Sequence, residues 1–194
     1  MKELKALSAN YASDKTNEMI SQIVAQAFAD GYRMGYKDRE NEMPVDLRDG
    51  RTEFIDLGLP SGTLWSNDYE KINNEISYIP YLTAKAFNLP SEEQLKELND
   101  FCRWEYELNN GVYKFICIGP NGNNVSFFNK GLYTFDGHFN NYSSKVAVFW
   151  LKDDSDSLDK SASYIYYENN IKLLSVKQFM GYKLPIRLVN RKIS

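Results

Sequence analysis

The first pattern along the chain is a helical repeat of apolar residues near the N-terminus. Between residues 14 and 39, apolar or small side chains recur at steps of three and four, the spacing of one face of an α-helix. Ser13 or Asp14 is suited to cap the first turn. The residues predicted on this face are Ile20, Val24, Ala27, Gly31 and Met34.

A helix of this length needs a partner for its apolar face. The partner is either the rest of the same chain or another protein, including further copies of this chain. We favour assembly, as a homo-oligomer such as a trimer or on a larger protein assembly, because a polar stretch separates the helix from the rest of the chain. The sequence therefore predicts an N-terminal helix for oligomerisation or anchoring at residues 1–40, a linker with Pro44 and Gly50 at 41–52, and one domain at 53–194.

Beyond residue 53 the pattern changes to the alternation of half-buried strands. Turn residues such as Asn109-Asn110-Gly111 and Pro120-Asn121-Gly122 separate the apolar segments, as in antiparallel hairpins. Residues 129–145 lack periodicity and are predicted to be a long loop. Strands are predicted at 53–59, 62–66, 104–108, 113–119, 124–128, 145–151, 161–167, 171–179 and 183–190.

Two helices are predicted within this domain. A short one covers residues 81–87, and a longer one follows Ser91, an N-cap residue with Gln94 three positions later as in a capping box. Leu95, Leu98 and Cys102 share one face of the longer helix, which we expect to pack on the core. Helices followed by antiparallel hairpins indicate an α+β fold, here an antiparallel β module with two short helices preceded by the N-terminal α-helix.

Charge and cysteine content exclude several classes of function. The net charge is −3 and no basic patch is evident, so we expect no nucleic-acid partner. No segment has the apolar length of a signal peptide or a membrane span, so we expect synthesis in a bacterial cytoplasm without membrane insertion. Cys102 and Cys117 lack metal-ligand spacing and are expected to be free, buried thiols.

Catalytic and cofactor chemistry finds little support in the sequence. The single histidine, His138, follows Asp136 in the long loop, and no nucleophile motif accompanies the pair. A lone loop histidine usually faces solvent. A pair of carboxylates for glycoside hydrolysis stays open, because the separation of such a pair is a three-dimensional property. We expect neither catalytic residues nor a cofactor, with a glycan-acting enzyme as the alternative.

An acidic segment near residue 155 is the weak candidate for a metal site. Asp153, Asp154 and Asp156 supply oxygen atoms of the kind that Ca²⁺ prefers. The segment lacks the central glycine and distal glutamate of a hand-type calcium loop. An acidic hairpin tip that is merely solvated is the simpler interpretation, and we expect no metal.

Aromatic residues make up 14% of the chain and supply the candidate binding face. Aromatic planes beside amides are typical of surfaces that hold sugars or protein partners. The alternative is that these rings fill a small core within the loop. The predicted ligand-binding residues are Tyr133, Phe135, His138, Asn140, Tyr142 and Trp150.

Several segments, in order, resemble one known family. They are "DLGLPSGTLW", "LPSEEQLKELNDFCRW", "NNGVYKFICIGPNGNNVSF", "VFWL" and "GYKLPIRLV", between residues 53 and 191. Together they resemble the major paralogous domain family abundant in Fibrobacter and Bacteroidetes. The resemblance implies a C-type lectin-like fold, with the first segment as an early strand and turn and the last as a closing core strand.

A function follows from the helix and the resemblance together. We expect a non-enzymatic binding or display protein, with the helix for assembly and the lectin-like module facing a cell-surface glycan or protein. A helix placed before a compact display domain is similar to phage and mobile-element proteins, so a virion component such as a head fibre or decoration protein is one setting. A purely structural scaffold is the plainer alternative.

Overall fold

The computed structural model describes residues 52–72 and 75–191. The chain divides into two units, Met1–Pro44 and Val45–Ser194, and the described residues belong to the second. The predicted helix at 1–40, with Ile20, Val24, Ala27, Gly31 and Met34, lies outside the described residues. The same holds for the linker up to residue 51.

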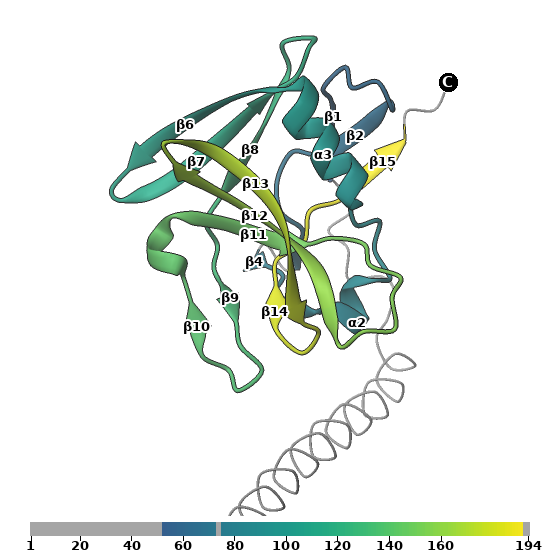
Figure 1. Cartoon of the computed structure of the whole chain (residues 1–194), viewed down its shortest axis with the longest axis vertical. Helices are drawn as coiled ribbons and strands as arrows, with labels where there is room; N and C mark the ends of the chain where they lie inside the picture. The colour runs from purple at the N-terminus through teal and green to yellow at the C-terminus, as the bar shows by residue number, and fades with distance from the viewer. Residues whose placement is uncertain (1–51, 73–74, 192–194) are drawn as a thin grey trace, which may run out of the picture. The chain divides into compact units, whose positions relative to one another are not determined.

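The described unit is α+β, with antiparallel sheets and two α-helices, as the sequence predicts (Figure 1). Two three-stranded sheets build most of it. The first sheet has the order β6 (Arg103–Asn109), β7 (Val112–Ile118) and β8 (Asn124–Phe128). The second has the order β11 (Val146–Trp150), β12 (Asp159–Glu168) and β13 (Asn170–Phe179).

The opening segment of the domain forms a third sheet with its last strand. β1 (Phe54–Asp56) and β2 (Thr63–Ser66) pair in antiparallel fashion, and β15 (Val189–Arg191) pairs with the other edge of β2. Leu57, Leu59 and Trp65 are buried, which explains the apolar positions on both sides of the turn. The segment therefore forms two strands around a tight turn and also contributes to the core.

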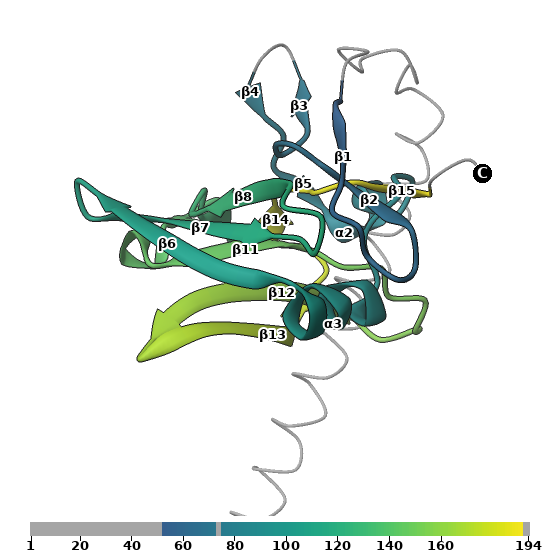
Figure 2. The ribbon, with the colours of Figure 1, turned by 90° about the horizontal axis from the view of Figure 1, so that it is seen from above.

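Short strands complete the fold. β3 (Lys71–Ile72) pairs with β4 (Glu75–Ile76). A four-stranded sheet has the order β10 (Phe139–Asn140), β9 (Leu132–Tyr133), β14 (Lys183–Leu184) and β5 (Ile79–Pro80). Seen from above, the β6–β7–β8 sheet and the β11–β12–β13 sheet lie as layers, with α3 at one end (Figure 2).

Two cores lie on the two faces of the second sheet. In β11, Ala147 and Phe149 belong to one buried cluster, whereas Val148 and Trp150 belong to the other. Successive strand residues point to opposite faces, so a strand covered on both sides must be apolar throughout. This arrangement explains why the segment "VAVFW" shows no polar alternation.

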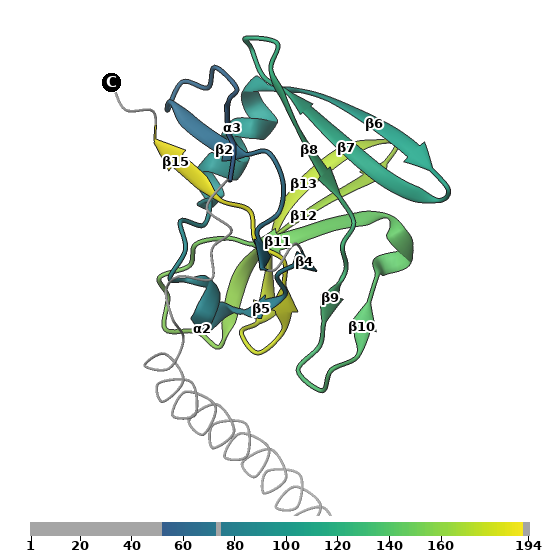
Figure 3. The ribbon, with the colours of Figure 1, turned by 180° about the vertical axis from the view of Figure 1, so that it is seen from behind.

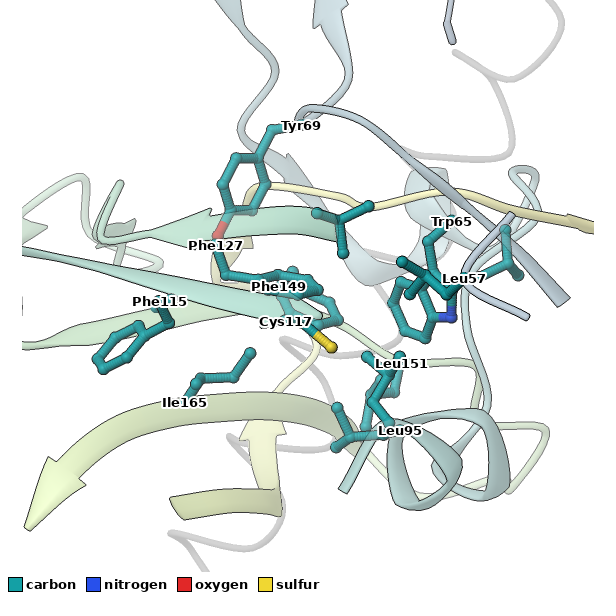
Figure 4. Packing of buried hydrophobic residues seen from close by; sticks show 14 of the residues in the cluster. Leu57, Trp65, Tyr69, Leu95, Phe115, Cys117, Phe127, Phe149, Leu151 and Ile165 are labelled. Atoms are coloured by element: carbon teal, nitrogen blue, oxygen red, sulfur yellow. The ribbon is translucent and has the colours of Figure 1, made fainter. Parts of the chain in front are cut away.

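The larger core is rich in aromatic rings (Figure 4). The rings of Phe127 and Phe149 stack with centroids 5.6 Å apart, and the edge of Trp65 meets Phe127 at 6.0 Å. Leu95 of α3 closes the cluster beside Leu151 (Figure 4). Side chains of this size dominate the free energy of core formation, so this region is the main source of stability.

The longer helix begins as predicted. In α3 (Glu92–Phe101) the Ser91 hydroxyl accepts from the Gln94 backbone N–H at 3.2 Å, and the Gln94 side chain accepts from the Ser91 N–H at 2.9 Å. The shorter helix, α2 (Tyr81–Ala84), ends earlier than predicted. Cys102 is a correction, because it follows α3 with extended backbone and is only partly buried, whereas Cys117 is fully buried.

Two predicted segments differ from the structure. Residues 129–145 are not a bare loop, because they contain β9, β10 and a 3₁₀ turn at Tyr142–Ser144. The single strand predicted at 183–190 is divided between β14 and β15, which belong to different sheets. Between β14 and β15, Glu70 N–H donates to Ile186 O at 3.0 Å and Ser66 N–H donates to Leu188 O at 2.9 Å. Over this stretch the chain leaves the sheet with β5 and β9 and joins the sheet with β2.

None of the helices within residues 52–72 and 75–191 combines the length and the apolar character needed to cross a membrane.

Candidate binding surface

The β9–β10 hairpin lies at the end of the domain remote from α3 (Figure 3). It carries a cluster of aromatic rings. Tyr133 and Phe139 lie directly opposite each other across the hairpin, with ring centroids 5.0 Å apart. Tyr78, from the segment before β5, meets them edge-on at 5.2 and 6.2 Å. Phe139 is 51% exposed, so one ring of this three-ring cluster presents much of its surface to solvent.

Backbone contacts hold the hairpin in place. The Tyr78 hydroxyl donates to the carbonyl of Lys130, which fixes Tyr78 against the hairpin. Gly131 has a φ of +67°, and a Cβ there would lie 2.6 Å from the carbonyl oxygen of Asn140. Only glycine fits this position, so the close approach of the two hairpin strands depends on it.

The hairpin turn adds an exposed phenylalanine and the histidine. Phe135 is 59% exposed and its ring meets the edge of Phe179 at 6.1 Å. The His138 side chain is 85% exposed, and its Nε2 lies 3.6 Å from Asp136 Oδ2. A hydrogen bond from Thr134, aided by His138, lowers the pKa of the Asp136 carboxyl. His138 therefore faces solvent, as expected for a lone loop histidine.

Three of the predicted ligand residues, Asn140, Tyr142 and Trp150, lie apart from the exposed rings. Asn140 follows Phe139, so it points to the other side of the hairpin, where its Oδ1 accepts from the Tyr142 N–H at 2.8 Å. The Tyr142 ring packs edge-on against Tyr164 at 5.4 Å, and the two hydroxyls are hydrogen-bonded. These contacts tie Tyr142 to the second sheet.

Trp150 is the clearest correction to the predicted binding set. It is 0% exposed, and its Nε1 donates to Ile79 O at 2.8 Å. The edge of its ring meets Tyr81 at 5.3 Å within the smaller core. A fully buried ring with a satisfied N–H is part of the core, so Trp150 does not contribute to a surface.

The acidic segment forms no metal site among the described residues. Asp153 Oδ2 accepts from Lys177 Nζ at 2.7 Å and from the Ser161 N–H at 2.9 Å, and Oδ1 accepts from the Ser155 N–H at 2.9 Å. Asp154 pairs with Lys152 at 3.2 Å. In residues 52–72 and 75–191, no three His, Cys, Asp or Glu side chains are placed to hold a metal ion.

A cleft of about 550 Å³ lies away from the hairpin, between the segment after α2, the connection after β11, and β15. Charged side chains from all three segments line it: Lys85, Lys152, Asp154 and Arg191. It shares no lining residue with the ring cluster of Tyr78, Tyr133 and Phe139. Of the residues that line this cleft, Asp154 alone was predicted from the sequence as functional, as a weak metal candidate.

Sequence reasoning missed part of the aromatic surface because its members come from distant segments. Tyr78 and Tyr133 are 55 positions apart in the sequence, and only the pairing of β5, β14 and β9 in one sheet brings their segments together. The run of aromatic residues around position 135 was the available signal for the part of the aromatic surface that lies on the hairpin.

Comparison of the chain with protein-family models, with curated proteins and with solved structures finds no match.

Proposed function

We propose that the chain is a non-enzymatic binding protein that recognises carbohydrate through the β9–β10 hairpin. The observation that carries this proposal is the ring cluster of Tyr78, Tyr133 and Phe139, of which Phe139 is about half exposed. An exposed aromatic ring held by its neighbours offers a rigid apolar plane, which suits the C–H face of a sugar. His138 beside it adds polar atoms that reach solvent.

A C-type lectin-like fold is part of this proposal. The resemblance implies an early strand and turn at the start of the domain and a closing core strand at its end. In support, β1 and β2 pair around a tight turn, and Val189, the last residue of the segment "GYKLPIRLV", begins β15, which completes their sheet. The membership in the major paralogous domain family is proposed on the same ordered segments.

The alternative of a glycan-acting enzyme has less support from the geometry. Hydrolysis of a glycosidic bond generally uses two carboxyl groups on opposite sides of the scissile bond. The cleft of about 550 Å³ is lined by one carboxylate, Asp154, and that group is paired with Lys152. At the hairpin, His138 lies beside Asp136 and both side chains are open to solvent. This pair contains one carboxyl group, whereas the reaction uses two.

The carbohydrate proposal is tested by binding of the full chain to an array of immobilised oligosaccharides and bacterial surface polysaccharides. Phe139→Ala should lower the signal at least tenfold, because it removes the most exposed ring of the cluster. Phe101→Ala is the matched control, since Phe101 is 52% exposed and lies on α3. Absence of binding to every glycan, or equal loss in both variants, would favour the structural-scaffold alternative.

We further propose that the helix at residues 1–40 assembles the chain into an oligomer that displays several binding modules, as in a phage head fibre or decoration protein. The support is the apolar face of Ile20, Val24, Ala27, Gly31 and Met34 in the sequence. Val24→Asp should place a charge in the seam and reduce the mass measured by light scattering. Gln22→Asp, off the predicted face, is the control, and a monomeric unmodified chain would contradict self-assembly.

A further inference from the structure

The cleft of about 550 Å³ has the size of a site for a small ligand. Its walls are held by backbone hydrogen bonds: Lys152 N–H donates to Pro90 O at 2.8 Å, and Val189 N–H donates to Asn88 O at 2.9 Å. These bonds join the connection after β11 and the start of β15 to the segment between α2 and α3. The walls are therefore positioned before any ligand binds, which lowers the cost of ordering on binding.

Positive charge exceeds negative charge in the cleft. Lys85, Lys152 and Arg191 line it with a single carboxylate, Asp154, which lies 3.2 Å from Lys152 Nζ. Lys85 and Arg191 have exposed side chains with no ion pair to any residue in the described part of the chain. Since the whole chain carries a charge of −3, this local excess of cations is opposite in sign to the average.

The uncharged groups of the cleft divide into engaged and available ones. The Tyr81 hydroxyl donates to Asp153 O at 2.7 Å and accepts from the Asp153 N–H at 2.6 Å, so it is occupied. The Gln94 amide is occupied by Thr63 and Ser91. Asn190 lines the cleft and uses its Oδ1 for the Arg191 N–H at 2.8 Å, and its NH₂ group donates to no other residue in the described part of the chain.

Apolar side chains supply the rest of the lining. Leu89 and Val189 are 5% and 7% exposed and belong to the packed cores, so they fix the floor of the cleft. The half-buried Phe87 supplies the larger accessible apolar surface. A ligand that matches this cleft has a negative group for the cations, hydroxyl groups for the side-chain amides, and an apolar face. A pyranose ring with a carboxylate has all three.

We propose that this cleft is a binding site for a carboxylated sugar of the uronic acid class. Arg191 and Lys85 bind the carboxylate, Arg191 with the two-pronged geometry that guanidinium groups allow. Asn190 donates to a ring hydroxyl, and the half-buried Phe87 contacts the C–H face. The site is independent of the hairpin surface and does not rest on the function proposed for it.

The test is calorimetric titration of the full chain with glucuronate, with its methyl ester, and with glucose, at low ionic strength and at 150 mM salt. Glucuronate should bind at least fivefold more tightly than the ester or glucose. Added salt should weaken its binding, because screening reduces the attraction between exposed charges. Equal affinity for the acid and the ester, or no heat of binding for glucuronate, would overturn the proposal.

Variants locate the binding. Lys85→Gln and Arg191→Gln should each raise the dissociation constant for glucuronate at least fivefold. Lys145→Gln is the control, because it removes the same charge from an exposed residue outside the cleft; it should leave the dissociation constant unchanged. All three change exposed side chains, and equal melting temperatures verify that each variant is folded. Equal weakening in Lys145→Gln would show a non-specific charge effect and refute the site. Phe139→Ala should leave glucuronate binding intact, which separates this proposal from the hairpin surface.

Discussion

The carboxylate of Asp153 accepts a hydrogen bond of 2.7 Å from the ammonium group of Lys177, and this ion pair joins the connection after β11 to β13. The Asp153 side chain is 5% exposed and that of Lys177 is 56% exposed. Ser161 donates to the same carboxylate oxygen from its hydroxyl at 3.0 Å. An aspartate that appears in the sequence as a metal candidate is thus committed to donors of its own domain.

The Asp153 pair predicts a loss of stability in acid. Burial raises the pKa of Asp153, but hydrogen bonds from Lys177, Ser155 and Ser161 outweigh burial and hold it below its usual range. In the unfolded chain this pKa is about 3.9. The stabilisation is therefore present above about pH 4 and is lost as the pH falls toward the folded-state pKa.

Asp153→Asn should lower the free energy of unfolding by about 1–3 kcal/mol at pH 7, because several donors lose a charged acceptor. Below about pH 4 the difference from the unmodified chain should shrink, because the Asp153 carboxyl of the unfolded chain then takes up a proton, which favours unfolding of the unmodified chain and has no counterpart in the asparagine variant. Urea titrations at pH 7 and pH 3 measure both effects. Asp156→Asn, at an exposed position, is the control, and a difference that persists unchanged in acid would contradict the assignment.

Trp150→Ala should destabilise the domain by about 3–5 kcal/mol, as for other large core residues. The ring is 0% exposed and contacts Tyr81, and its N–H is bonded to Ile79 O. Trp150→Phe should cost less, since it keeps most of the volume and loses the hydrogen bond. Thermal unfolding provides the measurement. A variant that retained full stability and lost glycan binding would return Trp150 to the binding surface.

Ser91→Ala should cost about 1 kcal/mol of stability, because the hydroxyl satisfies the Gln94 N–H at the start of α3. Ser91→Asp keeps an acceptor at the N-cap and should retain most of that stability. Urea unfolding of the two variants side by side compares them. If both lost the same amount, the contribution of the cap would be refuted in favour of a packing effect.

Two glycines near the β7–β8 turn should respond differently to alanine. A Cβ on Gly119 would lie 2.0 Å from Leu57 O, so Gly119→Ala forces the β1–β2 connection away from the sheet and should cost more than about 2 kcal/mol. Gly122 has a φ of +84° and open space, so Gly122→Ala should cost about 1–2 kcal/mol from backbone strain alone. Melting temperatures compare them, and the reverse order would show that the two backbones are not in contact.

Much of the fold could be predicted because its signals are local. The capping box of Ser91 and Gln94 involves neighbours on one helical turn, and the turn at Asn110 and Gly111 uses the positive φ angles that these residues favour. For the candidate surface, the same local reading found the aromatic residues Tyr133 and Phe135 but placed them in a loop, whereas Tyr133 lies on β9 of a hairpin. It did not find Tyr78 or the cleft, because their members are distant in the sequence.

The sequence by itself determined the α+β class and the hairpins β6–β7, β7–β8 and β12–β13, because backbone preference and two-residue alternation act between neighbouring residues. Tertiary structure decided which apolar residues face solvent: Trp150 enters the core and Phe139 remains exposed, although both are aromatic residues on strands. It also divided residues 183–190 between two sheets. The physical reason is that burial and strand partners depend on segments far away in the chain, which no local pattern encodes.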